Sequence, residues 1–170
     1  MKSQWFGDSY DIVKRYFVGI LKEVGYQVVV DPMLTDEWNG LEKKFYDFLG
    51  AAPTSGSNSR KSALLLDPDT GIGKEETKQH TTIEIIASHL QKYEVVFTFD
   101  QSFSRADSKS GKMEKQMIEK LDLLKKTGNF GFYYNSHAKF LFAASSKERL
   151  NTVEQKLRSS GLPKSRLLKI

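Results

Sequence analysis

The sequence predicts one α/β domain over residues 1–170, a three-layer sandwich around a mostly parallel sheet of about five strands with a C-terminal antiparallel hairpin. Stretches with the spacing of amphipathic helices alternate with short apolar runs typical of buried strands, and such alternation implies crossover connections between parallel strands. Near the end of the chain, two aromatic-rich runs flank Asn135-Ser136-His137, which indicates a hairpin. A chain of 170 residues is the length of one such domain.

The first half of the chain alternates helical and strand patterns that are bounded by residues typical of element ends. The expected elements are a helix at 8–24, a strand at 26–31, a helix at 36–49, a loop at 51–62 and a strand at 63–67. Asp8 is a suitable N-cap for the first helix, and Gly25 follows its last turn as a C-cap does. Both strands are short and apolar and end in Asp-Pro, so each is expected to be buried and followed by a turn.

The second half continues this alternation and closes with the hairpin and a last helix. The expected elements are a helix opening at 81–84, a strand at 93–100, a helix from 113 to about 126, strands at 130–134 and 138–142, and a helix from 145 to about 159. Thr81-x-x-Glu84 and Ser145-x-x-Glu148 have the form of capping boxes, in which a hydroxyl satisfies the first amides of a helix.

The composition excludes several classes of protein. The chain has no cysteine, which excludes disulfide scaffolds, thiolate nucleophiles and cysteine-type zinc sites. No apolar run approaches the ~20 residues of a membrane span, and the N-terminus lacks the apolar stretch of a signal peptide. We therefore expect a cytoplasmic protein with no membrane partner. The net charge of +5 is compatible with a nucleic acid or nucleotide as partner, and the oligomeric state stays open.

Three predicted strands end in aspartate, and a further aspartate lies two residues beyond the second. Parallel sheets bind ligands beyond the carboxyl ends of their strands, so Asp31, Asp67, Asp69 and Asp100 are expected along one edge. Carboxylates gathered without matching cations repel one another, and a divalent cation is their natural neutraliser. The sequence therefore predicts a Mg²⁺ or Mn²⁺ site at these four residues. The alternative is that Asp-Pro at the first two strands only forms turns.

Other charged residues complete this candidate site. The predicted catalytic residues are Asp67, Asp100, His137 and Lys139, with His137 as a general acid or base if the hairpin tip reaches the edge. The predicted anion-binding residues are Lys14, Arg60 and Arg105. Magnesium held by carboxylates beside basic residues is a recurring arrangement for phosphoryl transfer. The first functional hypothesis is therefore a metal-dependent phosphoesterase or nuclease.

Two stretches resemble a bacterial ribosomal-RNA adenine methyltransferase family. Gly7-Asp8-Ser9-Tyr10-Asp11-Ile12-Val13-Lys14-Arg15 is similar to the family's Gly-Asn-x-x-Asp-Val-x-Lys-His, and Asp67-Pro68-Asp69 is similar to its Asp-Pro-Pro, which ends a strand and faces the reacting amine. The resemblance implies a Rossmann-like sheet and adenosylmethionine as cofactor. Val30-Asp31-Pro32-Met33-Leu34 stands where the family's Gly-x-Gly turn is expected.

The candidate cofactor-binding residues are Asp8, Gly71 and Gly73. Asp8 lies in the first of the two similar stretches. The two glycines allow close approach of the backbone, whose amides can hold a phosphate or a cofactor carboxylate, although an ordinary tight loop is the alternative. Three hypotheses stay open: a metal-dependent phosphoesterase or nuclease, a divergent methyltransferase, and a non-enzymatic module that binds a nucleotide or a protein.

Overall fold

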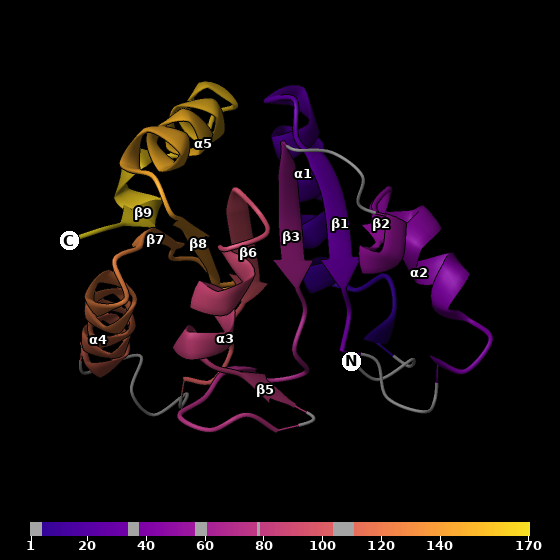
Figure 1. Ribbon diagram of the computed structural model, residues 1–170, viewed down its shortest axis with the longest axis horizontal. Coiled ribbons are helices and arrows are strands. Elements are labelled where there is room, and N and C mark those ends of the chain that lie inside the picture. Colours follow the sequence, from indigo (N-terminus) through magenta and orange to yellow (C-terminus); the bar gives the residue numbers. More distant parts are fainter. Residues whose placement is uncertain (1–4, 34–37, 57–60, 78, 104–110) are drawn as a thin grey trace.

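The computed structural model describes residues 5–33, 38–56, 61–77, 79–103 and 111–170, and within these ranges five α-helices surround a seven-stranded sheet (Figure 1). The helices are α1 (Ser9–Glu23), α2 (Glu42–Leu49), α3 (Ile83–His89), α4 (Lys112–Lys126) and α5 (Lys147–Ser159). The sheet contains β1 (Gln27–Asp31), β2 (Ala52–Pro53), β3 (Ser62–Leu66), β6 (Val95–Phe99), β7 (Phe130–Tyr134), β8 (Phe140–Ala144) and β9 (Leu167–Leu168). A separate ribbon pairs β4 (Gly71–Ile72) with β5 (His80–Thr81).

The sheet is mixed, with a parallel N-terminal part and antiparallel C-terminal strands, and this part of the prediction is confirmed. The strand order is β2-β1-β3-β6-β8-β7-β9. The first four of these strands are parallel, and β8 pairs antiparallel with both β6 and β7. Val29, Leu64, Val96 and Ala143 lie in one row across the centre of the sheet. The hairpin therefore folds back so that its second strand lies against β6.

A different set of helices covers each face of the sheet. Successive side chains of a strand point to opposite faces, so Val28 and Val30 pack with α1, α2 and α5, whereas Val29 packs with α3 and α4. Figure 1 shows α3 and α4 apart from α5 and α1. Burial on both faces explains why the central strands read as continuous apolar runs. None of the helices within the described ranges combines the length and apolar composition that crossing a bilayer requires.

The structure differs from the predicted elements in several ways. The short strands β2 and β9 extend the sheet beyond about five strands. The second helix begins at Glu42 instead of residue 36, because Gly40 adopts a positive φ of 81° in a turn before it; residues 34–37 lie outside the described ranges. The N-caps of α3 and α5 are Thr82 and Ser146, one residue later than the capping boxes predict.

Phe142 is at the centre of the aromatic core between the sheet and α1. Its ring is nearly parallel to those of its cross-strand neighbours Phe97, at a centroid distance of 5.6 Å, and Phe132, at 5.0 Å. The edge of Phe17 from α1 meets it at 5.1 Å and an interplanar angle of 89°. One side chain thus connects two neighbouring strands and the first helix.

We expect Phe142→Ala to lower the free energy of unfolding by about 3–5 kcal/mol, because the mutation opens a cavity among rings that cannot collapse onto it. Phe142→Leu should cost less, since it keeps most of the volume. Phe130→Ala is the control, because Phe130 is 39% exposed at the start of β7. Urea unfolding followed by circular dichroism measures the three variants. A cost for Phe142→Ala no larger than that for Phe130→Ala would contradict this assignment.

Candidate functional site

The carboxyl ends of β1 and β3 form the point where the chain changes from one face of the sheet to the other. β1 is followed by α2 on one face, and β3 is followed by α3 on the opposite face. In open α/β sheets, ligands bind beyond the carboxyl ends of the strands at such a change of face. Asp31 and Asp67 lie at this point, where the Asp67 amide donates to the Asp31 carbonyl at 3.0 Å.

The first turn of α1 is fixed above this edge by its own carboxylates. Asp8 is the N-cap, and its Oδ1 accepts from the amides of Tyr10 at 2.8 Å and Asp11 at 3.0 Å. Asp11 in turn accepts from the Gly7 amide at 2.8 Å. These bonds satisfy amides that have no partner within the helix. They also leave Asp11 and, one turn later, Lys14 on the buried side of α1.

Lys14 joins α1 to the end of β3 through two buried ion pairs. Its Nζ lies 2.9 Å from Oδ1 of Asp11 and 2.7 Å from Oδ2 of Asp67, and all three side chains are at most 3% exposed. Burial alone would lower the pKa of Lys14, but the two carboxylates outweigh it and the pKa is raised. The Asp11-Lys14-Asp67 triad therefore carries one ammonium and two carboxyl groups.

Asp67 has one oxygen without a hydrogen bond. Among the described residues, Oδ1 of Asp67 accepts no hydrogen bond although it is inaccessible to solvent. Burial raises the pKa of Asp67, and the Asp11 carboxylate adds to this, while Lys14 opposes it. An unsatisfied buried acceptor is costly and uncommon in native proteins. A donor from a ligand would remove this cost.

Aromatic side chains lie beside the triad. Phe99 at the end of β6 contacts both Tyr10, at a ring distance of 5.2 Å, and Lys14, whose Nζ is 5.1 Å from the ring centroid. Tyr10 is one turn from Lys14 on the same side of α1, and its hydroxyl is 2.9 Å from Nε2 of His137. The rings of Tyr10 and His137 are nearly parallel, at 5.4 Å and 17°. The hairpin tip thus reaches this edge, as the proposed role of His137 requires.

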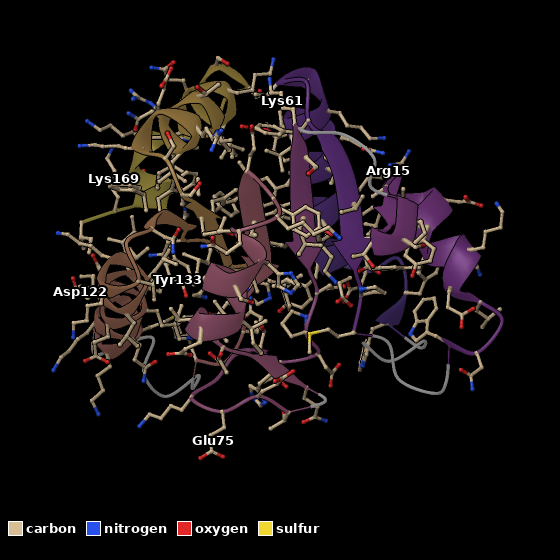
Figure 2. All side chains as sticks on the ribbon, in the orientation of Figure 1. Arg15, Lys61, Glu75, Asp122, Tyr133 and Lys169 are labelled. Atoms are coloured by element: carbon tan, nitrogen blue, oxygen red, sulfur yellow. The ribbon has the colours of Figure 1, made fainter. Side chains whose placement is uncertain are left out.

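Asp100 belongs to a second, separate network. Its Oδ1 accepts from the Ile72 amide at 3.1 Å and from the Ser102 amide and hydroxyl at 3.2 and 2.7 Å, and its Oδ2 accepts from Lys120 at 2.7 Å and the Tyr133 hydroxyl at 2.8 Å. Tyr133 is buried between α4 and the sheet (Figure 2), and burial with the nearby Asp100 carboxylate raises its pKa well above the usual value. Burial lowers the pKa of Lys120 more than Asp100 raises it.

The four aspartates predicted to share a divalent cation are not brought together as a metal-binding group. Among the described residues, no cluster of three or more histidine, aspartate or glutamate side chains could hold a metal ion. Asp67 and Asp100 are each paired with a lysine, and Oδ1 of Asp31 accepts from the amide of Met33 at 3.2 Å. The strand-end carboxylates are thus balanced by ammonium groups and backbone amides.

The predicted cofactor residues do not surround one cavity. Asp8 caps α1, and Gly71 packs against Asp100, where a Cβ would lie 2.8 Å from the Asp100 Cα. The Gly73 amide donates to the Thr81 carbonyl at 2.8 Å in the β4–β5 ribbon. Asp8 and Gly71 are therefore engaged in internal contacts, and Gly73 also lines a cavity between α3, α4 and the β4–β5 ribbon.

The predicted basic residues have different positions. Lys14 is in the triad and holds carboxylates instead of an external anion. Lys139 donates to the Ser136 carbonyl at 3.0 Å within the hairpin tip, and burial lowers its pKa. Arg60 and Arg105 lie outside the described residues.

Sequence reasoning missed Tyr10, Ser102, Lys120 and Tyr133. Lys120 is three residues after the buried Met117 and four before the buried Leu124, so helical spacing places it beside the apolar stripe of α4. That spacing is a signal for a partly buried lysine.

Comparison of the chain with protein-family models, with curated proteins and with solved structures finds no match. The function must therefore be inferred from the contacts of the site.

We expect Lys14→Met to lower the free energy of unfolding by about 3–5 kcal/mol, because it leaves two buried carboxylates without their cation. Lys43→Met is the matched control, since Lys43 pairs with Asp47 at 2.5 Å on the exposed side of α2 and such pairs contribute little. Chemical denaturation of both variants tests the difference. Similar unfolding free energies for the two variants would show that the buried pairs do not hold α1 to β3.

We expect Gly71→Ala to lower the free energy of unfolding by more than about 2 kcal/mol, through the clash with Asp100 and the φ of 128° that alanine disfavours. Gly73→Ala is the control, because the atoms nearest to its Cβ would be those of the His80 side chain, at 3.1 Å, and its φ is ordinary. Thermal unfolding of the two variants compares them. Equal melting temperatures would contradict the close packing of Gly71 on Asp100.

Proposed function

We propose that this chain is a Rossmann-like module that binds a nucleic acid or nucleotide by accepting a hydrogen bond from the exocyclic amine of a base at Asp67. The observation that carries the proposal is the unsatisfied Oδ1 of Asp67 at the change of face between β1 and β3. A buried acceptor at the ligand-binding edge of an open sheet needs a donor, and a ligand that supplies one gains the energy otherwise lost.

The charge of the triad favours an amine over a carbonyl group at this position. With one ammonium and two carboxylates, the triad has a net charge of −1 when both acids are ionised. The exocyclic amine of adenine or cytosine is an uncharged hydrogen-bond donor whose hydrogens carry partial positive charge. It can therefore donate to Oδ1 of Asp67 and is favoured by the negative charge of the triad. The oxygen that replaces the amine in hypoxanthine or uracil would face the carboxylate oxygen and be repelled.

The neighbouring aromatic side chains supply the second requirement of a base site. Unstacked bases are held between aromatic side chains and read at their hydrogen-bonding edge. Tyr10 and His137 are joined to each other by one hydrogen bond, and His137 is exposed. In the proposed complex this pair opens, the base stacks on Tyr10, and its amine reaches Asp67. The net charge of +5 supports a polyanionic partner.

A methyltransferase is the second candidate, and one contact favours it. Lys14 and Asp67 lie in the two stretches that resemble ribosomal-RNA adenine methyltransferases, and they form a direct ion pair across 53 positions of sequence. The Asp67 carboxylate facing an amine is what the resemblance implies. The candidate cofactor residues Asp8, Gly71 and Gly73 do not line one common cavity, so they give no support for an adenosylmethionine site. We therefore propose base binding without a methyl-transfer step.

The metal-dependent phosphoesterase remains a prediction without support from the described contacts. Phosphoryl transfer by metals needs carboxylates that share an ion. The lysines of the two networks take the place that such an ion would have at Asp67 and Asp100.

The proposal predicts that AMP binds at least about tenfold more tightly than IMP, a difference of about 1.4 kcal/mol for the lost hydrogen bond and the added repulsion. Isothermal titration calorimetry of both nucleotides measures this ratio. In Asp67→Asn the ratio should fall below about threefold, because an amide can donate as well as accept. Asp31→Asn removes a neighbouring charge at the end of a strand and is the control. This variant should still bind AMP more tightly than IMP.

Equal affinity for AMP and IMP, or a preference that survives in Asp67→Asn, would contradict the proposal. The melting temperature with added Mg²⁺ or adenosylmethionine separates the other hypotheses, because a ligand that binds the native state raises it. A rise with Mg²⁺ that Asp67→Asn abolishes would favour the phosphoesterase. A rise with adenosylmethionine would favour the methyltransferase.

A further inference from the structure

A cavity of about 630 Å³ opens between α3, α4 and the β4–β5 ribbon. Ile72, Ile83 and Leu123 give it apolar walls from three different elements. The volume is in the range of pockets that hold small ligands, about 300–1,000 Å³. None of the Asp67 contacts described above lines this cavity, so it is a distinct feature of the same edge.

Lys120 presents a hydrogen-bond donor to the cavity. Two of its three N–H groups donate to Asp100 and Ser102, both at 2.7 Å, and its Nζ is 4.3 Å from the centroid of the Phe103 ring. Within the described residues its third N–H has no acceptor. Because the Asp100 carboxylate already balances the ammonium, a neutral acceptor such as a carbonyl or ring nitrogen suits this position better than a second anion.

The charged side chains that line the cavity disfavour a phosphate group and favour a ligand that donates hydrogen bonds. Two glutamates, Glu84 and Glu119, and two lysines, Lys74 and Lys120, line the cavity, so their formal charges sum to zero, and the adjacent Asp100 adds a negative charge. A phosphate would meet two carboxylates here. The hydroxyl and amino groups of a neutral ligand would find acceptors in the same carboxylates. A flat apolar body edged with both donors and acceptors is the chemistry of a nucleoside.

A short segment of the chain connects the cavity with Asp67. The segment from Asp67 to Gly73 begins at the triad and ends in the cavity lining. The Gln101 amide donates to the Thr70 carbonyl of this segment at 3.0 Å, and the Gln101 side chain donates to the His137 carbonyl beside Tyr10. Gln101 thus contacts both the segment that connects Asp67 with the cavity and His137, whose ring stacks on Tyr10.

We propose that the α3–α4 cavity binds a neutral nucleoside unit, next to the one whose base reaches Asp67, so that the ligand is a single-stranded nucleic acid with its phosphates outside the cavity. The choice of a nucleoside as the ligand rests on the proposed function. The position of the cavity and the charges that line it are independent of that function. Two subsites on one strand raise the affinity through the effective concentration of the second unit.

The test uses the protein labelled with ¹³C at isoleucine methyl groups and titrated with adenosine, AMP and the dinucleotide ApA. Ile72 and Ile83 report on the cavity, and Ile20, in the core on the opposite face, is the internal control. Adenosine should shift the Ile72 and Ile83 signals and leave Ile20 in place. ApA should bind at least about tenfold more tightly than AMP.

Leu123→Ala removes one apolar wall of the cavity. Leu123 is 45% exposed, so the fold tolerates the change. In this variant ApA should no longer bind more tightly than AMP. Leu41→Ala is the matched control, since Leu41 is 47% exposed and lies away from the cavity lining. If adenosine and ApA leave Ile72 and Ile83 unshifted while AMP keeps its preference over IMP, the cavity inference fails and the proposed function stands. If ApA shifts both methyl groups and Leu123→Ala removes the gain, but AMP and IMP bind alike, the cavity inference holds and the role of Asp67 fails.

Discussion

The buried Lys14 ammonium is the interaction on which the rest of this edge depends. Removing an ammonium and two carboxylates from water costs several kcal/mol per ion, and only close, well-oriented pairing offsets that cost. The N-cap bonds of Asp8 fix the first turn of α1 and so fix where Asp11 and Lys14 point. Lys14 then holds the end of β3 through Asp67. The oxygen of Asp67 that remains unsatisfied is therefore held rigidly, which makes it a suitable group for recognising a ligand.

The carboxyl edge of the sheet is organised as two lysine–aspartate networks instead of one shared centre. Lys14 comes from α1 on one face and Lys120 from α4 on the other, and each meets the aspartate that ends a central strand. Asp67 and Asp100 are each paired with a lysine of their own, so the two networks do not need a common ion. The first network keeps an acceptor without a donor, and the second keeps a donor without an acceptor among the described residues. A ligand that satisfies both networks would therefore donate a hydrogen bond to the first and accept one from the second.

Local sequence patterns predict the α/β class, the parallel N-terminal strands and the C-terminal hairpin, because burial periodicity fixes α1, β1, β3, β6, α4 and α5. They do not predict β2, β4, β5 or β9, since a two-residue strand exists only through its pairing partner. Asp67 and Asp100 are predicted as site residues because they end strands, and Lys14 is predicted because it is basic. Pairing between Lys14 and Asp67 is a contact over 53 positions, and no local signal shows that a lysine will neutralise this aspartate instead of a metal.

The two outermost strands have a consequence for how the sheet meets other chains. β2 and β9 have two residues each, and Pro53 in β2 has no amide hydrogen to offer. Long, flat edges act as templates on which a second chain adds as a further strand, and short edges with proline suppress this. The central strands of five residues, which are rich in valine, leucine and phenylalanine, would be prone to such addition if they lay at a border. Their placement inside the sheet, behind two very short strands, protects this protein against aggregation by strand addition.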